Sequence, residues 1–384
     1  MTAVAPPSAE QPRRAEASRP RVASVESGAG GGAATCASGL VGSERARTRP
    51  SKGLHRWATA LVLLTWPLIW VGGLVTTLDA GMAVPDWPNT YGYNMFAYPW
   101  QTWLFGPFDL FIEHGHRLLA SVVGMIAIVT TVVAFRSEPR PWVRYLAYGA
   151  LGAVIFQGVL GGVRVLLDAR TVAMIHGCFG PAFFAICVAL AACTGKFWFD
   201  VQPDERLLAA ARRSRRLTLW MVSAAFLQIV VGAQLRHVPP SASQSWFSHV
   251  VYTHLALACL VVGLGGHVAW RLRVPGQSGR WLRFPATCLG CLVLVQLALG
   301  VGSWVAKYGY PHFAQSWPGA AGFLSHAQGY SESIIVTGHA ATGSLILAVA
   351  TLLMIRVRRV LSVVHADDGL LSGGSMTRLQ GSWS

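Results

Sequence analysis

The chain has 384 residues, of which 53% are hydrophobic and only 12% charged, and its formal net charge is +15. Such an apolar composition is typical of a protein that spans a lipid bilayer and excludes an ordinary soluble domain. A basic excess also occurs in nucleic-acid-binding proteins, but no RNA- or DNA-binding motif accompanies it here, so we expect no nucleic-acid partner.

The first 50 residues are rich in Ala, Gly, Ser, Pro and Arg and contain no apolar core segment. They cannot bury enough surface to fold, so residues 1–50 are predicted to form a disordered cytoplasmic tail. They lack the central apolar stretch of a secretory signal, and their scattered glutamates argue against a transit peptide. A second disordered tail is predicted for residues 360–384, beginning near Val360.

Eight apolar stretches follow the first tail, each close to the roughly 20 residues that a helix needs to cross the hydrocarbon layer. We therefore predict an all-α, polytopic membrane protein with eight transmembrane helices. The stretches are Trp57–Thr77, Glu113–Phe135, Val143–Leu166, Val172–Cys193, Leu217–Leu235, Val250–Trp270, Phe284–Val305 and Ile334–Ile355.

Lysine and arginine gather in the tails and in every second connection between these stretches. The other connections carry few basic residues beyond Arg164, Arg170, Arg236 and Lys307. Because basic loops remain in the cytoplasm, both termini are predicted to be cytoplasmic, with four external loops.

An internal duplication is visible in the helices. Two signatures of the form Gln-x-x-x-Gly, at Gln157 and Gln296, lie 139 positions apart, and His116 and His254 lie 138 positions apart. The sequence therefore predicts two tandem four-helix bundles, over residues 51–200 and 201–359. Each has an even number of crossings, so we expect a pseudo-two-fold axis along the membrane normal.

Each unit carries two histidines near the external ends of its even-numbered helices, His116 and His176 in the first and His254 and His339 in the second. An ionisable residue within the membrane is costly and is usually retained for function. Two neutral imidazoles facing each other across a four-helix bundle suit the axial positions of an iron porphyrin, so each unit is predicted to hold one haem. Zinc would need further ligands at this level, and only Glu113 in the first unit offers one.

The second apolar stretch opens with Glu113-His-Gly-His116-Arg117. At about 100° per residue, Glu113, His116 and Arg117 share one helix face, whereas His114 points away from it. Only the first unit adds a carboxylate and an arginine to its histidine pair, so we expect chemistry there and electron storage in the second unit. Arg117 is a candidate to pair either with a haem propionate or with Glu113.

The run Gly72–Gly81 followed by Pro85-Asp-Trp-Pro88, the sequence Glu113-x-x-His116-Arg117 and the three later histidines together resemble the haem A synthase family. The resemblance covers about residues 57–356. It implies an internally duplicated, eight-helix enzyme that oxidises a methyl group of haem O to the formyl group of haem A for a terminal oxidase.

The resemblance also implies roles for individual residues. His254 and His339 would bind a haem b cofactor, His116 and His176 would bind the substrate haem, and Glu113 would be the catalytic carboxylate. Some members carry a cysteine pair in the first external loop. This chain has no cysteine between Cys36 and Cys178, so a thiol-based step there is absent or differently supplied.

The expected setting is a bacterial plasma membrane, with haem O as substrate and with haem O synthase and terminal oxidase subunits as partners. The alternative function is a membrane cytochrome that only passes electrons between two haems b, which would use all four histidines and leave Glu113 without a role. A transporter built from repeats is less favoured, because no broken helix with paired charges is evident at mid-membrane.

The distribution of Lys and Arg generates a topology prediction. A reporter fused near Gly319 should report an external location, and a reporter fused after Arg359 should report a cytoplasmic one. Alkaline phosphatase and green fluorescent protein fusions measure the two sides. If both fusions report the same side, the count of eight crossings is wrong.

Overall fold

The structure is a computed structural model that describes residues 52–239, 241–310 and 329–376, with the backbone alone at 364–376. These residues belong to one compact unit, 48–384. Within the described ranges the regular structure is helical, apart from one isolated bridge between Thr90 and Tyr93. The all-α prediction is therefore confirmed.

Eight long helices account for the eight predicted stretches, and each is long and apolar enough to cross a membrane. The protein is thus a multi-pass membrane protein, as predicted. The helices are α2 (Lys52–Thr77), α4 (Phe108–Ser137), α5 (Pro141–Leu167), α6 (Arg170–Thr194), α8 (Glu205–Arg236), α9 (Gln244–Arg271), α10 (Gly276–Tyr308) and α11 (Tyr330–Met376).

The helix ends follow local sequence signals. Asp204 caps α8 by accepting a hydrogen bond from the backbone N–H of Leu207 at 2.7 Å, and Ser243 caps α9 by accepting one from Trp246 at 3.1 Å. Pro141 begins α5, where its fixed φ suits the first helical turn. Gly309 ends α10 with a φ of +78°, a conformation that glycine adopts without steric cost.

Four short helices that the sequence did not predict lie in the connections. η1 (Ala80–Met82), η2 (Met95–Ala97) and α3 (Trp100–Leu104) all lie between α2 and α4, and α7 (Lys196–Asp200) lies between α6 and α8. The loop between α2 and α4 is therefore a folded segment that precedes the first histidine helix.

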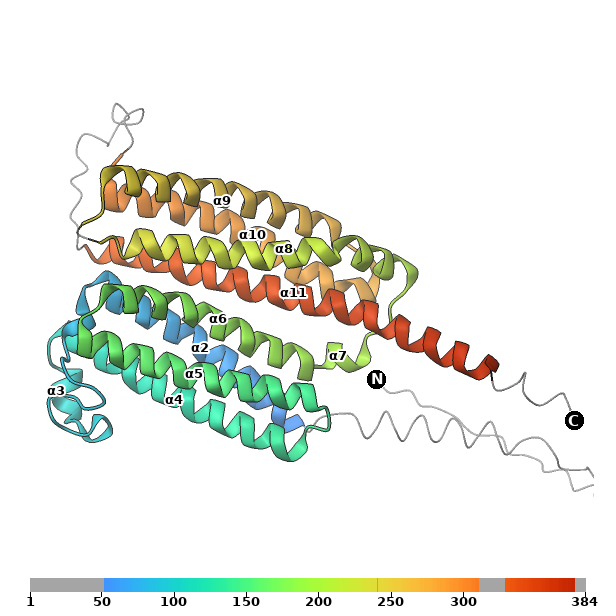
Figure 1. The fold of residues 1–384 in the computed structure, drawn as a ribbon, viewed down its shortest axis with the longest axis horizontal. Coiled ribbons are helices and arrows are strands. Elements are labelled where there is room, and N and C mark those ends of the chain that lie inside the picture. The colour runs from blue at the N-terminus through green and yellow to red at the C-terminus, as the bar shows by residue number, and fades with distance from the viewer. Residues whose placement is uncertain (1–51, 240, 311–328, 377–384) are drawn as a thin grey trace, which may run out of the picture. The chain divides into compact units, whose positions relative to one another are not determined.

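The helices contact one another in the same circular order twice. In the first half of the chain α2 and α5 each contact both α4 and α6, and in the second half α8 and α10 each contact both α9 and α11. Helix α11 joins the halves by contacting α2 and α6, as the neighbouring ribbons in Figure 1 show. The division into four-helix units over 51–200 and 201–359 and the pseudo-two-fold relation between them stay predictions.

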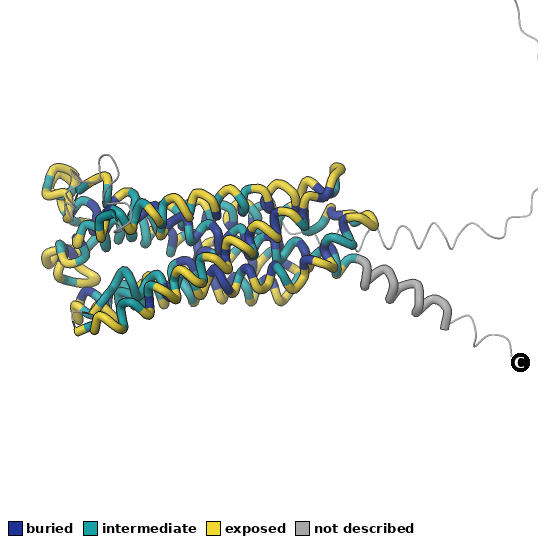
Figure 2. The backbone as a smooth tube through the Cα atoms, turned by 90° about the horizontal axis from the view of Figure 1, so that it is seen from above, coloured by how far each residue is buried: buried dark blue, intermediate teal, exposed yellow. Residues whose placement is uncertain are grey.

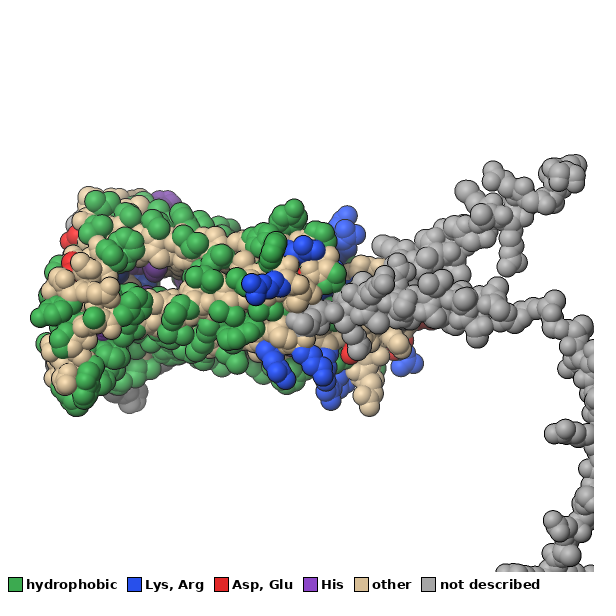
Figure 3. Space-filling view, turned by 90° about the horizontal axis from the view of Figure 1, so that it is seen from below, with side chains coloured by type: hydrophobic (Ala, Val, Ile, Leu, Met, Phe, Trp, Pro, Cys, Tyr) green, Lys and Arg blue, Asp and Glu red, His purple; other side chains and the backbone are tan. Residues whose placement is uncertain are grey.

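The helices alternate in direction, so they have two distinct ends. The histidine end carries His116, His176, His254 and His339, and the arginine-rich end carries Arg136, Arg206, Arg273 and Arg359. On the face drawn in Figure 3, Lys and Arg side chains gather at one end and apolar side chains cover the helices beyond them. An apolar outer surface is what a lipid environment requires.

The hydrophobic core lies in the middle of the helices and toward the arginine-rich end. Figure 2 shows the buried residues along the inner faces of the helices. The three clusters of buried apolar side chains are built around residues such as Leu353, Leu190 and Phe183. Among the described residues, no cluster includes the level of the four histidines, where the side chains are mostly half-buried.

One boundary prediction is wrong. Val360, where the C-terminal tail was predicted to begin, is fully buried, and α11 continues to Met376. Val357, Val360 and Val363 continue the apolar face of the helix and pack with the core of the second half, so the helix does not end there. The predicted tail at 1–50 and the loop that contains Gly319 lie outside the described residues.

Candidate functional site

Each of the four predicted histidines packs its ring against a glycine of the preceding long helix. A methyl group built on Gly232 would lie 3.1 Å from the ring of His254, and one on Gly300 would lie 3.1 Å from that of His339. The corresponding distances are 3.3 Å for Gly161 and His176 and 2.7 Å for Gly72 and His116. Glycine is therefore needed at these points because any side chain would displace an imidazole.

The four rings also share their orientation. The Nδ1 atom of each is buried, while each histidine as a whole is partly exposed. The partly exposed atoms of each ring therefore lie away from Nδ1, and in His254 the Nε2 atom lies 3.2 Å from the side-chain nitrogen of Gln228. A neutral imidazole that presents Nε2 from a fixed ring is the usual ligand for a metal ion or a haem iron.

His254 and His339 form a close pair, with ring centroids 6.3 Å apart and ring planes at 66°. Two metal–nitrogen bonds of about 2 Å each place their nitrogens about 4 Å apart, and the half-widths of two rings make up the remainder. The separation thus fits one metal atom between two imidazoles. His116 and His176 make no comparable ring contact, although they lie close enough to interact electrostatically.

Glutamines stand beside the histidines and reinforce the pattern. Gln157 donates a hydrogen bond to the backbone carbonyl of His176 at 3.2 Å, and Gln228 donates one to that of His254 at 3.1 Å. Each glutamine lies one helical turn before the glycine that packs against the same histidine. The Gln-x-x-x-Gly signature therefore supports both the backbone and the ring of its histidine.

Glu113 is the carboxylate nearest to the first histidine pair and is only 2% exposed. Its Oε2 accepts a hydrogen bond from the backbone N–H of Val84 at 2.8 Å, and its Oε1 accepts one from Arg117 at 2.9 Å. A second cation, Arg164 of α5, lies 4.0 Å from the same Oε1. The carboxylate is thus held between two guanidinium groups and one amide, which compensate its burial.

Arg117 also fixes the folded loop over the first unit. Its guanidinium donates to the backbone carbonyls of Val84 and Asp86 at 2.7 Å and of Asn89 at 3.1 Å. Of the two partners predicted for Arg117, a haem propionate and Glu113, the structure contains the pairing with Glu113. The same guanidinium also donates to the three backbone carbonyls. The position of Glu113 and the position of the loop depend on the same arginine.

Asp86 orders the turn that follows. Its carboxylate accepts hydrogen bonds from the backbone N–H groups of Tyr91 and Gly92, each at 2.8 Å. Burial acts to raise the pKa of Asp86, but these donors and the charge of Arg117 outweigh it and hold the pKa below its ordinary value. This turn lets Trp87 pack against Gly162 of α5, so the loop covers the first unit from above.

His114 lies apart from the other histidines, as predicted from the helical spacing. Its ring is buried, its Nδ1 lies 3.1 Å from the Thr90 hydroxyl, and it contacts the rings of Tyr98 and Trp103. It therefore anchors the loop to α4.

Arg164 is a site residue that sequence reasoning noted but did not assign. Its guanidinium donates to the backbone carbonyl of Gly81 at 2.7 Å and faces Glu113. The sequence did contain one signal for a functional role of Arg164. It is one of the few basic residues at the predicted external side of the membrane, where the positive-inside rule disfavours them.

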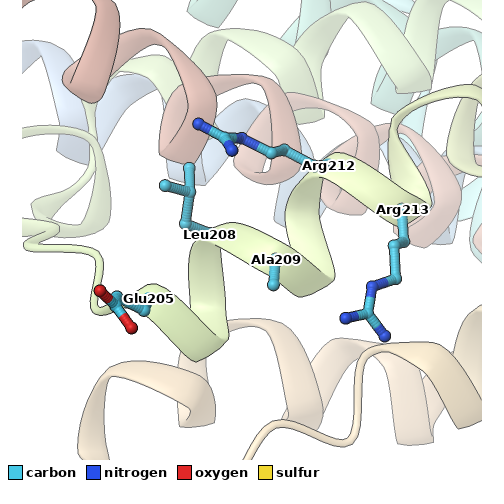
Figure 4. A pocket seen from close by; sticks show the side chains of 5 residues that line it. All are labelled: Glu205, Leu208, Ala209, Arg212 and Arg213. Carbon is cyan, nitrogen blue, oxygen red and sulfur yellow. The ribbon is translucent and has the colours of Figure 1, made fainter. Parts of the chain in front are cut away.

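Two surface depressions lie far from the histidines, near the arginine-rich end. One, of about 380 Å³, is lined by α8 residues between Glu205 and Arg213 (Figure 4), and the other, of about 490 Å³, includes Trp142, Trp198 and Arg358. In Figure 4 the Arg212 and Arg213 side chains point in different directions and do not converge on one point. Among the described residues, no group of three or more His, Cys, Asp or Glu side chains could hold a metal ion.

Comparison with known proteins points to one family. The family model described as COX15-CtaA, cytochrome oxidase assembly protein, matches residues 55–248. The chain is 26% identical to the heme A synthase of Shouchella clausii over 51% of its own length and 63% of that protein. It is 30% identical to one heme A synthase of Cereibacter sphaeroides, over 47% of this chain and 54% of the relative. A second heme A synthase from that species is 26% identical, over 65% of this chain and 68% of the relative.

The chain spans less than two thirds of the length of the first two of these relatives. The family match nevertheless covers half of the chain and includes His116 and His176 with the glycines that pack against them, Gly72 and Gly161. This chain therefore belongs to the COX15-CtaA family of cytochrome oxidase assembly proteins.

Proposed function

We propose that this protein is a haem A synthase, which oxidises a methyl group of haem O to the formyl group of haem A. The observation that carries the proposal is an asymmetry between two otherwise similar histidine pairs. Both pairs are cradled by glycines, but only the first has a buried carboxylate and two arginines beside it. The names of the relatives, heme A synthase, support the same function.

In the second unit, His254 and His339 would hold a haem b cofactor. The fit rests on their 6.3 Å separation, the buried Nδ1 edges and the absence of a packed apolar cluster at their level among the described residues. A bis-histidine haem b supplies reversible one-electron storage. The protein's own contribution is to keep both imidazoles neutral, oriented and away from water.

In the first unit, His116 and His176 would bind the haem O substrate through its iron. Conversion of a methyl group to a formyl group is a four-electron oxidation, which balances as R–CH3 and water giving R–CHO, four protons and four electrons. It therefore needs an external electron acceptor as well as a group that takes up protons from the reacting carbon. Glu113 lies one turn before His116 on the same helix face, where it would accept such a proton. Arg117 and Arg164 fix the carboxylate, and the loop with Trp87 excludes water from the same side.

The second unit has neither the carboxylate nor the arginine at the corresponding positions of helix α9. A shift of 138 residues relates His116 to His254 and places Val251 and Leu255 where the first unit has Glu113 and Arg117. A cytochrome with two equivalent haems b, the alternative function, would have no use for this difference. The asymmetry therefore favours one substrate site and one electron-storing site.

The proposed setting is the bacterial plasma membrane with both termini in the cytoplasm, which places the histidine end outside. This orientation is supported by the Lys and Arg residues at the arginine-rich end. Haem O synthase would deliver the substrate, and terminal oxidase subunits would receive the product.

The ligand assignment generates one prediction. Replacing His254 or His339 with Ala should abolish the bis-histidine haem b absorption spectrum of the purified protein, because each removes one axial ligand. His267→Ala is the matched control, since His267 lies on the same helix as His254 but is exposed near the arginine-rich end. An equal loss of spectrum in all three variants would attribute the effect to misfolding.

The role of Glu113 generates a second prediction. Glu113→Gln keeps the size of the side chain but cannot accept a proton, so we expect at least a tenfold loss of haem A formation with accumulation of haem O. The haem b spectrum of the second unit should remain. Total haems are extracted from membranes and separated by reversed-phase chromatography.

Glu138→Gln is the matched control for this variant. Glu138 is also 2% exposed and is paired with an arginine of the same region, Arg140, at 2.7 Å, but it lies at the arginine-rich end of α4. A purely structural role for Glu113 predicts that both substitutions reduce haem A in parallel with protein yield. Normal haem A from Glu113→Gln would exclude the catalytic role.

A further inference from the structure

Arg236, at the end of α8, is an arginine whose partners are all neutral. Its guanidinium donates to the backbone carbonyl of Gly73 at 2.6 Å and to the hydroxyl of Thr77 at 2.5 Å, both on α2. The Thr77 hydroxyl in turn lies 3.0 Å from that of Thr337 on α11. Arg236 thus sits where the two four-helix groups meet, and its charge is not neutralised there.

A second cation without an acidic partner stands nearby on α10. Lys307 contacts the backbone carbonyl of Leu235 at 3.5 Å and lies within electrostatic range of Arg236. Two neighbouring like charges repel each other, and the half-buried Arg236 is the costlier of the two to leave uncompensated, whereas Lys307 is exposed.

The chain supplies almost no negative charge in this region. Between Arg236 and His249, and between Ala306 and Ser333, the sequence contains a single acidic residue, Glu332. Glu332 accepts a hydrogen bond from the backbone N–H of Gly329 at 3.3 Å, and no ion pair joins it to Arg236 or Lys307. Among the described residues neither Arg236 nor Lys307 has an ion-pair partner, so both charges are available to an anionic ligand.

His237, the residue after Arg236, lies in the same positively charged region. Burial, together with the charges of Arg236, Arg164, Lys307 and Arg170, lowers the pKa of His237 to about 4. Its imidazole is therefore neutral at physiological pH and does not add to the charge, but it lies within reach of cations from both halves of the chain.

Both cations stand directly above the second histidine pair. Arg236 follows Gly232 by four residues and Lys307 follows Gly300 by seven. At about 100° per residue each cation lies within about 40° of its glycine on the helix circumference. Each therefore shares the helix face that packs against His254 or His339, one or two turns closer to the histidine end.

We propose that Arg236 and Lys307 bind the two propionate carboxylates of the haem held by His254 and His339. The inference rests on the proposed function, because it requires a haem in the second unit. The two carboxylates of a porphyrin leave from one edge of the ring, so they meet two cations placed on one side of the iron ligands. Because Arg236 is also tied to α2, the cofactor is positioned against the first unit.

The same cations suit the phosphate of an anionic lipid headgroup, which shares the anionic oxygen chemistry of a carboxylate. The haem is favoured because Arg236 and Lys307 share the helix faces of the glycines that pack against His254 and His339. The experiment separates these two sources.

The test measures how fast haem b leaves the purified protein for excess apomyoglobin, in nanodiscs of neutral phosphatidylcholine. Arg236→Gln and Lys307→Gln should each release haem about tenfold faster than the wild type, because each removes one charge-assisted contact. Arg273→Gln, an exposed arginine at the arginine-rich end, is the control and should not change the rate. Arg236→Lys keeps the charge and should restore most of the retention.

A second arm changes the ligand in place of the protein. Wild-type protein reconstituted with haem b dimethyl ester, which lacks the carboxylate charges, should release it as fast as a double variant with both Arg236→Gln and Lys307→Gln releases native haem. The double variant should not distinguish the two haems. Equal retention of native haem and its ester by the wild type would overturn the proposal.

Two further outcomes are informative. If wild-type retention depends on adding phosphatidylglycerol, and the variants match the wild type without it, the cations bind a lipid headgroup and the proposal is wrong. A wild-type protein that purifies without any haem b would contradict the proposed function itself, which distinguishes that failure from the failure of the propionate site.

Discussion

The site depends on the close approach of a glycine to an imidazole, repeated four times. Gly72, Gly161, Gly232 and Gly300 have no side chain at the points where the four histidine rings lie. This contact fixes each ring with Nδ1 buried. An added methyl group would meet the ring at 3.3 Å or less in every case, so the orientation of the ligands is built into the packing of the helices.

The two units have similar arrangements of helices and histidines, but they differ in the charged side chains near the histidines. The first unit places its cations, Arg117 and Arg164, around the carboxylate of Glu113, where they hold a group suited to proton transfer. The second leaves Arg236 and Lys307 without an acidic partner, which suits them to hold an anionic ligand. Under the proposed function, the same repeated scaffold would offer one site for chemistry and one for a tightly held cofactor.

Much of this arrangement could be predicted from the sequence. Hydropathy located the eight helices, and the spacing around Glu113 correctly separated His114 from the face shared by His116 and Arg117. The end of α11 could not be located, because Val360 is retained by packing with the distant core of the second half. The partnership of Arg164 with Glu113 was missed for a similar reason, since α4 and α5 bring together residues 51 positions apart. Such contacts depend on tertiary structure and have no local signal.

The central claim is that the two histidine pairs bind different haems. The most direct measurement is the haem content of wild-type protein purified from cells that also make haem O, with the haems extracted and separated by chromatography. The account predicts haem b together with haem O or haem A. Haem b alone, at two equivalents per chain, would contradict it and identify the protein as an electron-carrying cytochrome.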